Sequence, residues 1–268
     1  MRRWTCICSI AIGVAILSDP GGTTAQAASK MSADEVVAFV QSLQSKRTMR
    51  LTKDAPKVSI QQMRQAANGE YVAGVRIVDG VAAGQGYGVA VYDLPISQLW
   101  KAVIDEPHFP GHIPVEQSFV IDGVARTSPR SLFQYLDLPL ISDRWWVTRM
   151  RHNAKLFAAT DGVVWELSWK DATHTANVQG TRAARFVTEG VPVAWTHGSW
   201  LLVGLPDGRT YTEYYVWSDP GGMVPAGPAS RFASGKVTET LEGMEAFARK
   251  HIPKCTAQFK RPDGNPMP

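Results

Sequence analysis

The chain has 268 residues, of which 28 are Lys or Arg and 24 are Asp or Glu, for a formal net charge of +4 at pH 7. This small basic excess includes no run of Lys and Arg interleaved with aromatic residues, so the sequence does not indicate a nucleic-acid-binding protein. A chain of this length is sufficient for one large domain with a sizeable core.

The first 27 residues have the pattern of an export signal. Arg2 and Arg3 form a basic start, an apolar run of about a dozen residues follows at Cys6–Leu17, and Ala25-Gln26-Ala27 offers a small-residue cleavage site. The apolar run is too short to span a bilayer. We therefore expect a cleaved signal peptide over 1–27 and an exported protein, periplasmic in a bacterium with two membranes. An uncleaved anchor is the alternative.

The chain that remains after cleavage has one cysteine, Cys255, so no internal disulfide can form and the core must hold the fold. It keeps 26 basic and 23 acidic residues, a net charge of +3, because the leader contains Arg2, Arg3 and Asp19. This charge allows a weak attraction to anionic lipid head groups, and hence a transient membrane contact, without specifying one.

The mature chain begins with a helix signal. Ser32-Ala33-Asp34-Glu35 is a capping box, and apolar residues follow it at helical spacing, which predicts a helix over 33–45. This helix and its connector make up an N-terminal region, 28–56, whose role the sequence leaves open. The main domain is expected over 57–253.

The main domain opens with strand-like runs separated by the turn signals Asn68-Gly69 and Asp79-Gly80. A short amphipathic helix over 96–104 follows, and from Val115 the pattern favours strands again. The expected strands are 57–64, 71–78, 84–92, 118–122, 131–137, 145–152, 163–170, 182–188, 199–205 and 210–217.

The last long element is a helix over 229–251, with an apolar stripe that includes Val237, Leu241 and Met244. The segment 254–268 contains three prolines near its end and is predicted to be a flexible tail. Helices segregated from one large antiparallel sheet define an α+β fold. Because sheet twist curls such a sheet, a long helix across its concave side leaves room for an internal cavity.

Three stretches carry a family resemblance: "YDLPISQLWKAVIDEPHFPGHIP", "SLFQYLDLPLISDRWWVTRMR" and "GSWLLVGLPDGRTYTEYYVWSDPGGMVPAGPASRF". In their order and spacing they resemble the START and START-like lipid-binding domains of the Bet v 1-like helix-grip superfamily. The resemblance covers 84–251. It implies a curved antiparallel sheet wrapped around a long C-terminal helix, with an internal apolar cavity that holds a lipid or another hydrophobic molecule for transport or sequestration.

The resemblance also assigns a role to the loop before the last helix. In this family the loop and the helix are thought to gate the cavity, and here they correspond to Asp219, Gly221, Gly222 and Pro225. Glycines can absorb backbone changes at a hinge, while prolines stiffen the loop. A static turn is the alternative that the sequence leaves open.

Strand alternation sorts the candidates for the cavity wall. In 144–151, Trp146, Thr148 and Met150 are expected to face inward, because the opposite face carries two arginines that are costly to bury unpaired. In the last strand the family pattern turns Tyr214 inward, with the reverse left open. Phe133 or Tyr135, Phe186, Trp200 and Phe232 complete the expected wall.

The resemblance bears on the ligand as well. Some START lipid transporters have an arginine paired with an acid inside the cavity, and the matching position here is Met150, although a one-residue slip in register would bring in Arg149. An apolar residue at this position favours a sterol or another neutral lipid over a ligand with a charged head group.

Other chemistry finds little support. His108 and His112 have a metal-ligand spacing only on a helix, and Pro110-Gly111 between them prevents one. We expect no metal and no cofactor. Two alternatives remain: an interaction module whose cavity is filled by side chains, and an enzyme of the polyketide cyclase/aromatase type. The enzyme would use Arg185, His197, Glu213 or Tyr214 as acid or base if they face inward.

Overall fold

The computed structural model describes residues 29–138, 142–221, 226–250 and 256–267. The expected signal peptide and Cys255 lie outside these residues. The α-helices are α1 (Ala33–Ser42), α2 (Ile60–Ala67), α3 (Ile96–Val103), α4 (Ala154–Ala159) and α5 (Ala226–Lys250). Four short 3-10 helices are η1 (Gln44–Met49), η2 (Glu106–His108), η3 (Arg182–Thr188) and η4 (Thr256–Gln258).

One nine-stranded sheet dominates the molecule, and its main path runs in the order β1-β2-β9-β8-β6-β5-β4-β3 with every neighbouring pair antiparallel. The short β7 pairs with β5 in parallel. The strands are β1 (Val72–Val78), β2 (Val81–Tyr92), β3 (Gln117–Gly123), β4 (Arg130–Leu136), β5 (Arg144–His152), β6 (Val164–Asp171), β7 (Val191–Pro192), β8 (Trp195–Gly204) and β9 (Thr210–Asp219).

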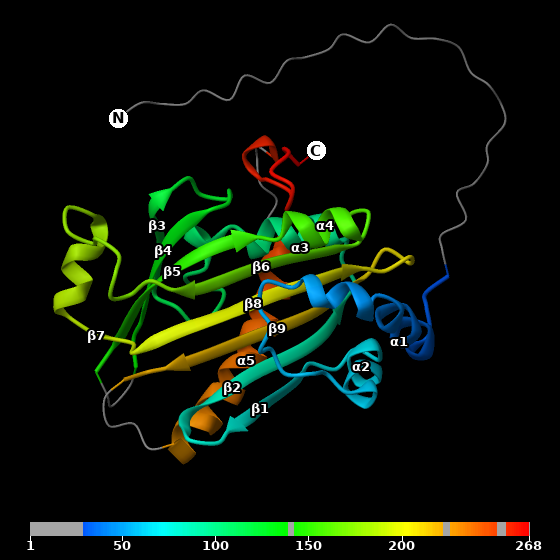
Figure 1. The fold of residues 1–268 in the computed structure, drawn as a ribbon, viewed down its shortest axis with the longest axis horizontal. Coiled ribbons are helices and arrows are strands. Elements are labelled where there is room, and N and C mark those ends of the chain that lie inside the picture. The colour runs from blue at the N-terminus through cyan, green and yellow to red at the C-terminus, as the bar shows by residue number, and fades with distance from the viewer. Residues whose placement is uncertain (1–28, 139–141, 222–225, 251–255, 268) are drawn as a thin grey trace, which may run out of the picture.

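The long helix α5 lies across one face of the sheet, behind β2, β8 and β9 in the view of Figure 1. Its buried residues Val237, Leu241 and Met244 join the largest apolar cluster, together with Leu99 and Trp100 of α3. Helix and sheet approach closely at β2, where a Cβ on Gly88 would lie 2.7 Å from the side chains of Val237 and Leu241. The α+β helix-grip class predicted from the sequence is confirmed.

The N-terminal helices cover the opposite face of the sheet (Figure 1). Val36, Val37 and Val40 of α1 pack with Leu201 and Tyr211 in a second apolar cluster. Two buried glutamates on this face, Glu166 of β6 and Glu213 of β9, bind the segment that follows α1. The N-terminal region is therefore docked on the back of the sheet.

That docking is polar as well as apolar. Arg47 donates to Glu213 Oε1 at 2.7 Å, and Arg50 donates to Glu213 Oε2 at 3.0 Å, to Glu166 Oε1 at 3.4 Å and to Ser199 Oγ at 3.1 Å. Burial acts to raise the pKa of Glu213, but the two guanidiniums outweigh it and hold that pKa below its ordinary value.

Three sequence expectations are wrong. The predicted strand 57–64 overlaps helix α2, because Ser59 and Gln62 form a capping box that the strand interpretation overlooked. The predicted strand 182–188 is the 3-10 helix η3, which Thr181 caps by accepting from the backbone N–H of Ala183.

The third concerns the C-terminal segment, predicted as a flexible tail. Residues 256–267 fold back onto the domain, and Phe259 and Met267 are buried in the largest apolar cluster. The indole of Trp100 donates to the Lys260 carbonyl at 2.8 Å, and a bridge joins Lys260 to Pro266. Prolines here shape a packed turn rather than an unstructured end.

Candidate functional site

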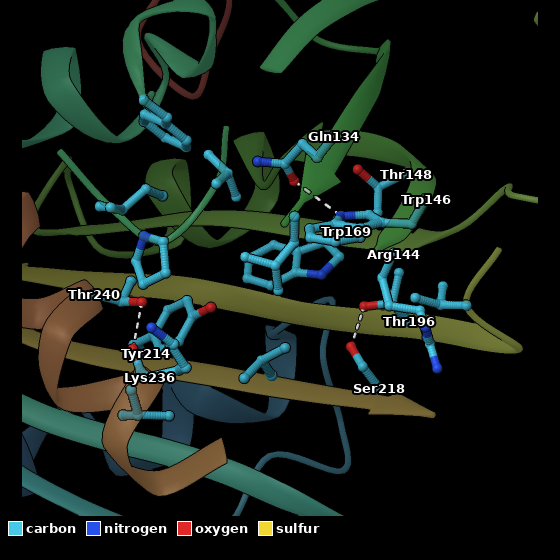
Figure 2. A pocket seen from close by; sticks show the side chains of 18 of the residues that line it. Gln134, Arg144, Trp146, Thr148, Trp169, Thr196, Tyr214, Ser218, Lys236 and Thr240 are labelled. Atoms are coloured by element: carbon cyan, nitrogen blue, oxygen red, sulfur yellow. Dashed lines mark hydrogen bonds between the residues drawn. The ribbon is translucent and has the colours of Figure 1, made fainter. Parts of the chain in front are cut away.

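An apolar cavity of about 570 Å³ lies between the sheet and α5 (Figure 2). Strands β4, β5, β6, β8 and β9 contribute alternate residues to it, and α5 contributes Lys236, Val237 and Thr240. The segment after η2 contributes Phe109, Ile113, Pro114 and Val115. A volume of this size is typical of small-molecule sites, which are mostly apolar with a few placed polar groups.

Five of the residues expected in the wall do line this cavity. They are Trp146, Thr148, Met150, Trp200 and Tyr214. The alternation argument works for β5 because its other face carries Arg149, which pairs with Asp122 at 2.6 Å on the exposed side.

Three expected residues lie elsewhere. Phe133 and Tyr135 point to the opposite face of β4, and with Phe186 they pack in a separate cluster around Trp145 and Val147. The physical reason is again alternation: Trp146 pairs with Gln134 across β4 and β5, so the even residues of β4 face the cavity. Because η3 covers the other face, both faces of β4 are buried.

The remaining expected residues are only partly described. Phe232 lies in α5, but its side chain is outside the described part of the structure, as are Gly222 and Pro225. Asp219 ends β9, and its carboxylate accepts from the Gly221 backbone N–H at 2.9 Å. Gly221 has φ of 69°, the left-handed region that favours glycine.

The turn at Pro220 and Gly221 is held by an arginine of the cavity wall. Arg144 Nε donates to the Pro220 carbonyl at 2.6 Å, and its Nη2 donates to the Gly221 carbonyl at 3.3 Å. Its Nη1 donates to the carbonyls of Ser142 and Asp143. All three guanidinium nitrogens therefore donate to backbone carbonyls, and Arg144 links the start of β5 to the end of β9.

Polar groups are few in the wall and widely spaced. The Trp146 indole donates to Gln134 Oε1 at 3.0 Å, Thr148 donates to the Met150 sulfur at 3.3 Å, and Thr196 bonds with Ser218. The Tyr214 ring lies 4.5 Å from that of Trp200, centroid to centroid, and burial raises the pKa of its phenol. Among the described lining residues there is no Asp, Glu or His.

A buried ion pair lies beside the cavity rather than in its wall. Met150 lines the cavity as expected, and its cross-strand neighbour Arg130 pairs with Glu106, both side chains being fully buried. Arg130 also contacts His152 Nε2 at 3.0 Å. Burial, and then the charge of Arg130, lowers the pKa of His152 to about 3, so this imidazole is neutral at pH 7.

The residues considered for an enzyme are divided between the faces. Glu213 is held by arginines on the far side of the sheet, and His197, also on that side, contacts Asp54 at 2.7 Å. The Arg185 guanidinium lies over the Phe186 ring, 4.4 Å from its centroid. Of the four, Tyr214 alone lines the cavity, so the cyclase alternative loses three of its candidates.

Sequence reasoning missed the wall residues Gln134, Leu167 and Trp169. Their signal was present: in β6, Trp165, Leu167 and Trp169 alternate with polar residues, which is the pattern of a strand with one apolar face.

The side chains described form no group of three or more potential metal ligands, and no helix among those residues is long and apolar enough to cross a membrane.

No protein-family model and no curated protein sequence matches this chain. Solved structures do. A STAR-related lipid transfer protein from Xanthomonas axonopodis matches with a TM-score of 0.53 and 19% identity, over 67% of this chain and 99% of that one. Human StAR-related lipid transfer protein 5 matches with a TM-score of 0.53 and 12% identity, over 81% and 97%.

The lipid transfer and protein localization domain of human StarD13 matches with a TM-score of 0.50 and 14% identity, over 74% of this chain and 100% of that one. At such identities the similarity establishes architecture and leaves function to the site. Element order, the sheet curled around α5 and these matches agree, and the chain has the START-like helix-grip fold.

Proposed function

We propose that this protein binds a lipid or another hydrophobic small molecule in the cavity and transports or sequesters it. The observation that carries the proposal is the cavity itself: about 570 Å³ of space walled mainly by apolar and aromatic side chains. Two structures of the same fold are described as lipid transfer proteins, which supports the same role here. Burial of the ligand's apolar surface, at roughly 25 cal/mol per Å², supplies the driving force.

The size and charge of the cavity favour a compact neutral ligand. Its volume of about 570 Å³ lies within the range of sites for small molecules. That suits a sterol-like body or one hydrocarbon chain better than a phospholipid with two chains. The cations in the wall do not favour an anionic head group, because Arg144 is bonded to backbone carbonyls and Lys236 pairs with Glu239.

We propose that this activity takes place in the periplasm. The expected signal peptide supports export to the periplasm, where a carrier would load and release its ligand through transient membrane contacts. The loop that begins at Asp219 is the proposed gate, with Arg144 as the anchor of its described part.

The test is native mass spectrometry of the exported protein purified from its own host, followed by lipid extraction. A single mass adduct that extracts as one lipid class is expected. A matched variant, Thr148→Trp with Val216→Trp, fills the cavity and should lose the adduct, whereas Ile77→Trp, at a side chain that is 65% exposed, should keep it.

Two outcomes would count against the proposal. A clean unliganded mass, unchanged after incubation with sterols, fatty acids and phospholipids, would refute a carrier. An adduct that persists in the cavity-filled variant would place the ligand elsewhere on the protein.

A further inference from the structure

The hydrogen-bonding atoms left free in the cavity wall are unevenly distributed between donors and acceptors. Tyr214 Oη, Gln134 Nε2, Trp169 Nε1 and Trp200 Nε1 belong to lining residues, and among the described residues none of these atoms has a hydrogen-bond partner. Three are N–H groups that can only donate. The fourth is a phenol whose pKa is raised by burial, so it keeps its proton.

These atoms are unpartnered but not sealed in protein. The buried side-chain atoms without a partner, in the part of the chain described, are Ser118 Oγ, His152 Nδ1, Thr212 Oγ1 and Arg261 Nε. None of the four donors is among them, so each keeps accessible surface in a residue that lines the cavity. Figure 2 shows the Gln134 amide nitrogen and the Tyr214 hydroxyl both turned toward the space between the walls.

The amide acceptor in the same wall is already engaged, and the remaining side-chain acceptors are neutral hydroxyl oxygens and the Met150 sulfur. Gln134 Oε1 accepts from the Trp146 indole, which fixes the orientation of the amide and turns its N–H₂ group toward the cavity. The hydroxyls of Thr196 and Ser218 bond to each other, and that of Thr240 donates to the Lys236 carbonyl at 2.6 Å. With no carboxylate or imidazole among the described lining residues, a cation has no charged partner and no imidazole to pair with in this wall.

We propose that the bound ligand carries one or more carbonyl-type oxygens, in ketone, ester or quinone groups, that accept hydrogen bonds from the Tyr214 hydroxyl and the Gln134 amide. This inference rests on the proposed function and specifies its ligand class: a neutral apolar body with an acceptor oxygen and no required donor. A hydrocarbon without oxygen would leave the donors unpaired in an apolar enclosure, which is unfavourable. Tyr214 and Gln134 thus determine specificity.

A matched set of probes tests this. Heptadecane, 9-heptadecanol and 9-heptadecanone share one flexible chain and differ only in the oxygen, so shape does not decide the comparison. Each is delivered from cyclodextrin and titrated calorimetrically into the full mature chain. The ketone should bind at least as tightly as the alcohol and about tenfold more tightly than the alkane.

Two variants assign the effect. Tyr214→Phe keeps the ring and removes the hydroxyl, and should weaken ketone binding about three- to tenfold while alkane binding is unchanged. Gln134→Glu keeps the acceptor for Trp146 but removes the amide donors, and should weaken the ketone more than the alcohol. Tyr215→Phe is the control, since its hydroxyl lies on the other face against Asp54; ketone and alkane binding should both be retained.

Alkane binding also reports whether each variant keeps an intact cavity. Equal affinity of the wild type for ketone and alkane, or a Tyr214→Phe variant that loses both equally, would overturn the inference and leave the proposed function standing. If the wild type binds none of the three probes, the inference about the ligand class is overturned, and the lipid adduct in native mass spectrometry decides separately whether the proposed function stands.

Discussion

Glu213 and Tyr214 are consecutive residues of β9, yet their side chains belong to opposite faces of the sheet. The Tyr214 phenol lies in the cavity wall, 4.5 Å from Trp200 between ring centroids. The Glu213 carboxylate is buried on the far side, where Arg47 and Arg50 bind it. The same strand therefore supports the ligand site and anchors the N-terminal region, so the anchor stabilises the wall from behind.

Replacing the central cation of that anchor should be costly. Arg50 is 6% exposed and binds both Glu213 and Glu166, so Arg50→Ala leaves two buried carboxylates short of a cation. We expect the free energy of unfolding to fall by about 3–5 kcal/mol, measured by urea denaturation. Arg64→Ala is the control: its pair with Asp34 is exposed, and its loss should cost no more than about 1 kcal/mol. Equal costs for the two variants would contradict this account.

The contacts of Glu213 with Arg47 and Arg50 also predict how the free energy of unfolding depends on pH. Burial acts to raise the pKa of Glu213, but Arg47 and Arg50 hold it below its ordinary value. A depressed folded pKa contributes stability above the unfolded pKa of about 4.3, and this contribution is lost as the pH falls through the lower, folded pKa.

Glu213→Gln removes that titration. It should be less stable than the wild type at pH 7, and the gap should narrow as the pH falls below about 4.3. Urea unfolding at a series of pH values measures this, with exposed Glu242→Gln as the control. A gap that stays constant down to pH 3 would show that Glu213 contributes by packing rather than by charge.

Much of the fold could be predicted because its signals are local. Alternation in β5 and β9, the capping box at Ser32 and the stripe of α5 each depend on residues close in the sequence. The sides of β5 were also predictable, since arginines on one face exclude it from an apolar interior.

The rest depended on contacts between distant segments. β4 is buried on both faces, since η3 covers the side away from the cavity, so alternation could not tell Phe133 from Gln134 as a wall residue. The docking of the N-terminal region joins residues more than a hundred positions apart, as Arg50 and Glu166 do. No pattern within a short window contains such a pair.

A substitution at Gly243 tests how tightly α5 packs against the loop at His112. By helix propensity alone, Gly243→Ala would stabilise by about 1 kcal/mol. A Cβ at this position, however, would lie 2.0 Å from the His112 carbonyl oxygen, a backbone atom that cannot rotate away. We therefore expect a loss of about 1–3 kcal/mol in unfolding free energy.

Thermal and urea unfolding measure the effect of Gly243→Ala. Ala246→Gly, at an exposed position on the same helix, calibrates the propensity term and should cost about 1 kcal/mol. A more stable Gly243→Ala variant would mean that the loop at His112 moves easily. The packing of α5 against this loop would then be looser than the close contact implies.

The C-terminal segment should behave as part of the core. The Phe259 ring is 2% exposed, packs in the same cluster as Trp100 and Met267, and carries the Arg126 guanidinium 4.8 Å above its centroid. Phe259→Ala should cost about 3–5 kcal/mol, because it opens a cavity and removes the apolar surface that holds the segment in place. Asn265→Ala, at an exposed residue of the same segment, should change the free energy of unfolding much less.

Hydrogen exchange distinguishes a packed C-terminal segment from a flexible tail. If the segment is part of the core, its amides and those of α3 are protected together in the wild type and lose protection together in Phe259→Ala. Unprotected amides over 256–267 in the wild type would instead support the flexible tail that the prolines suggested.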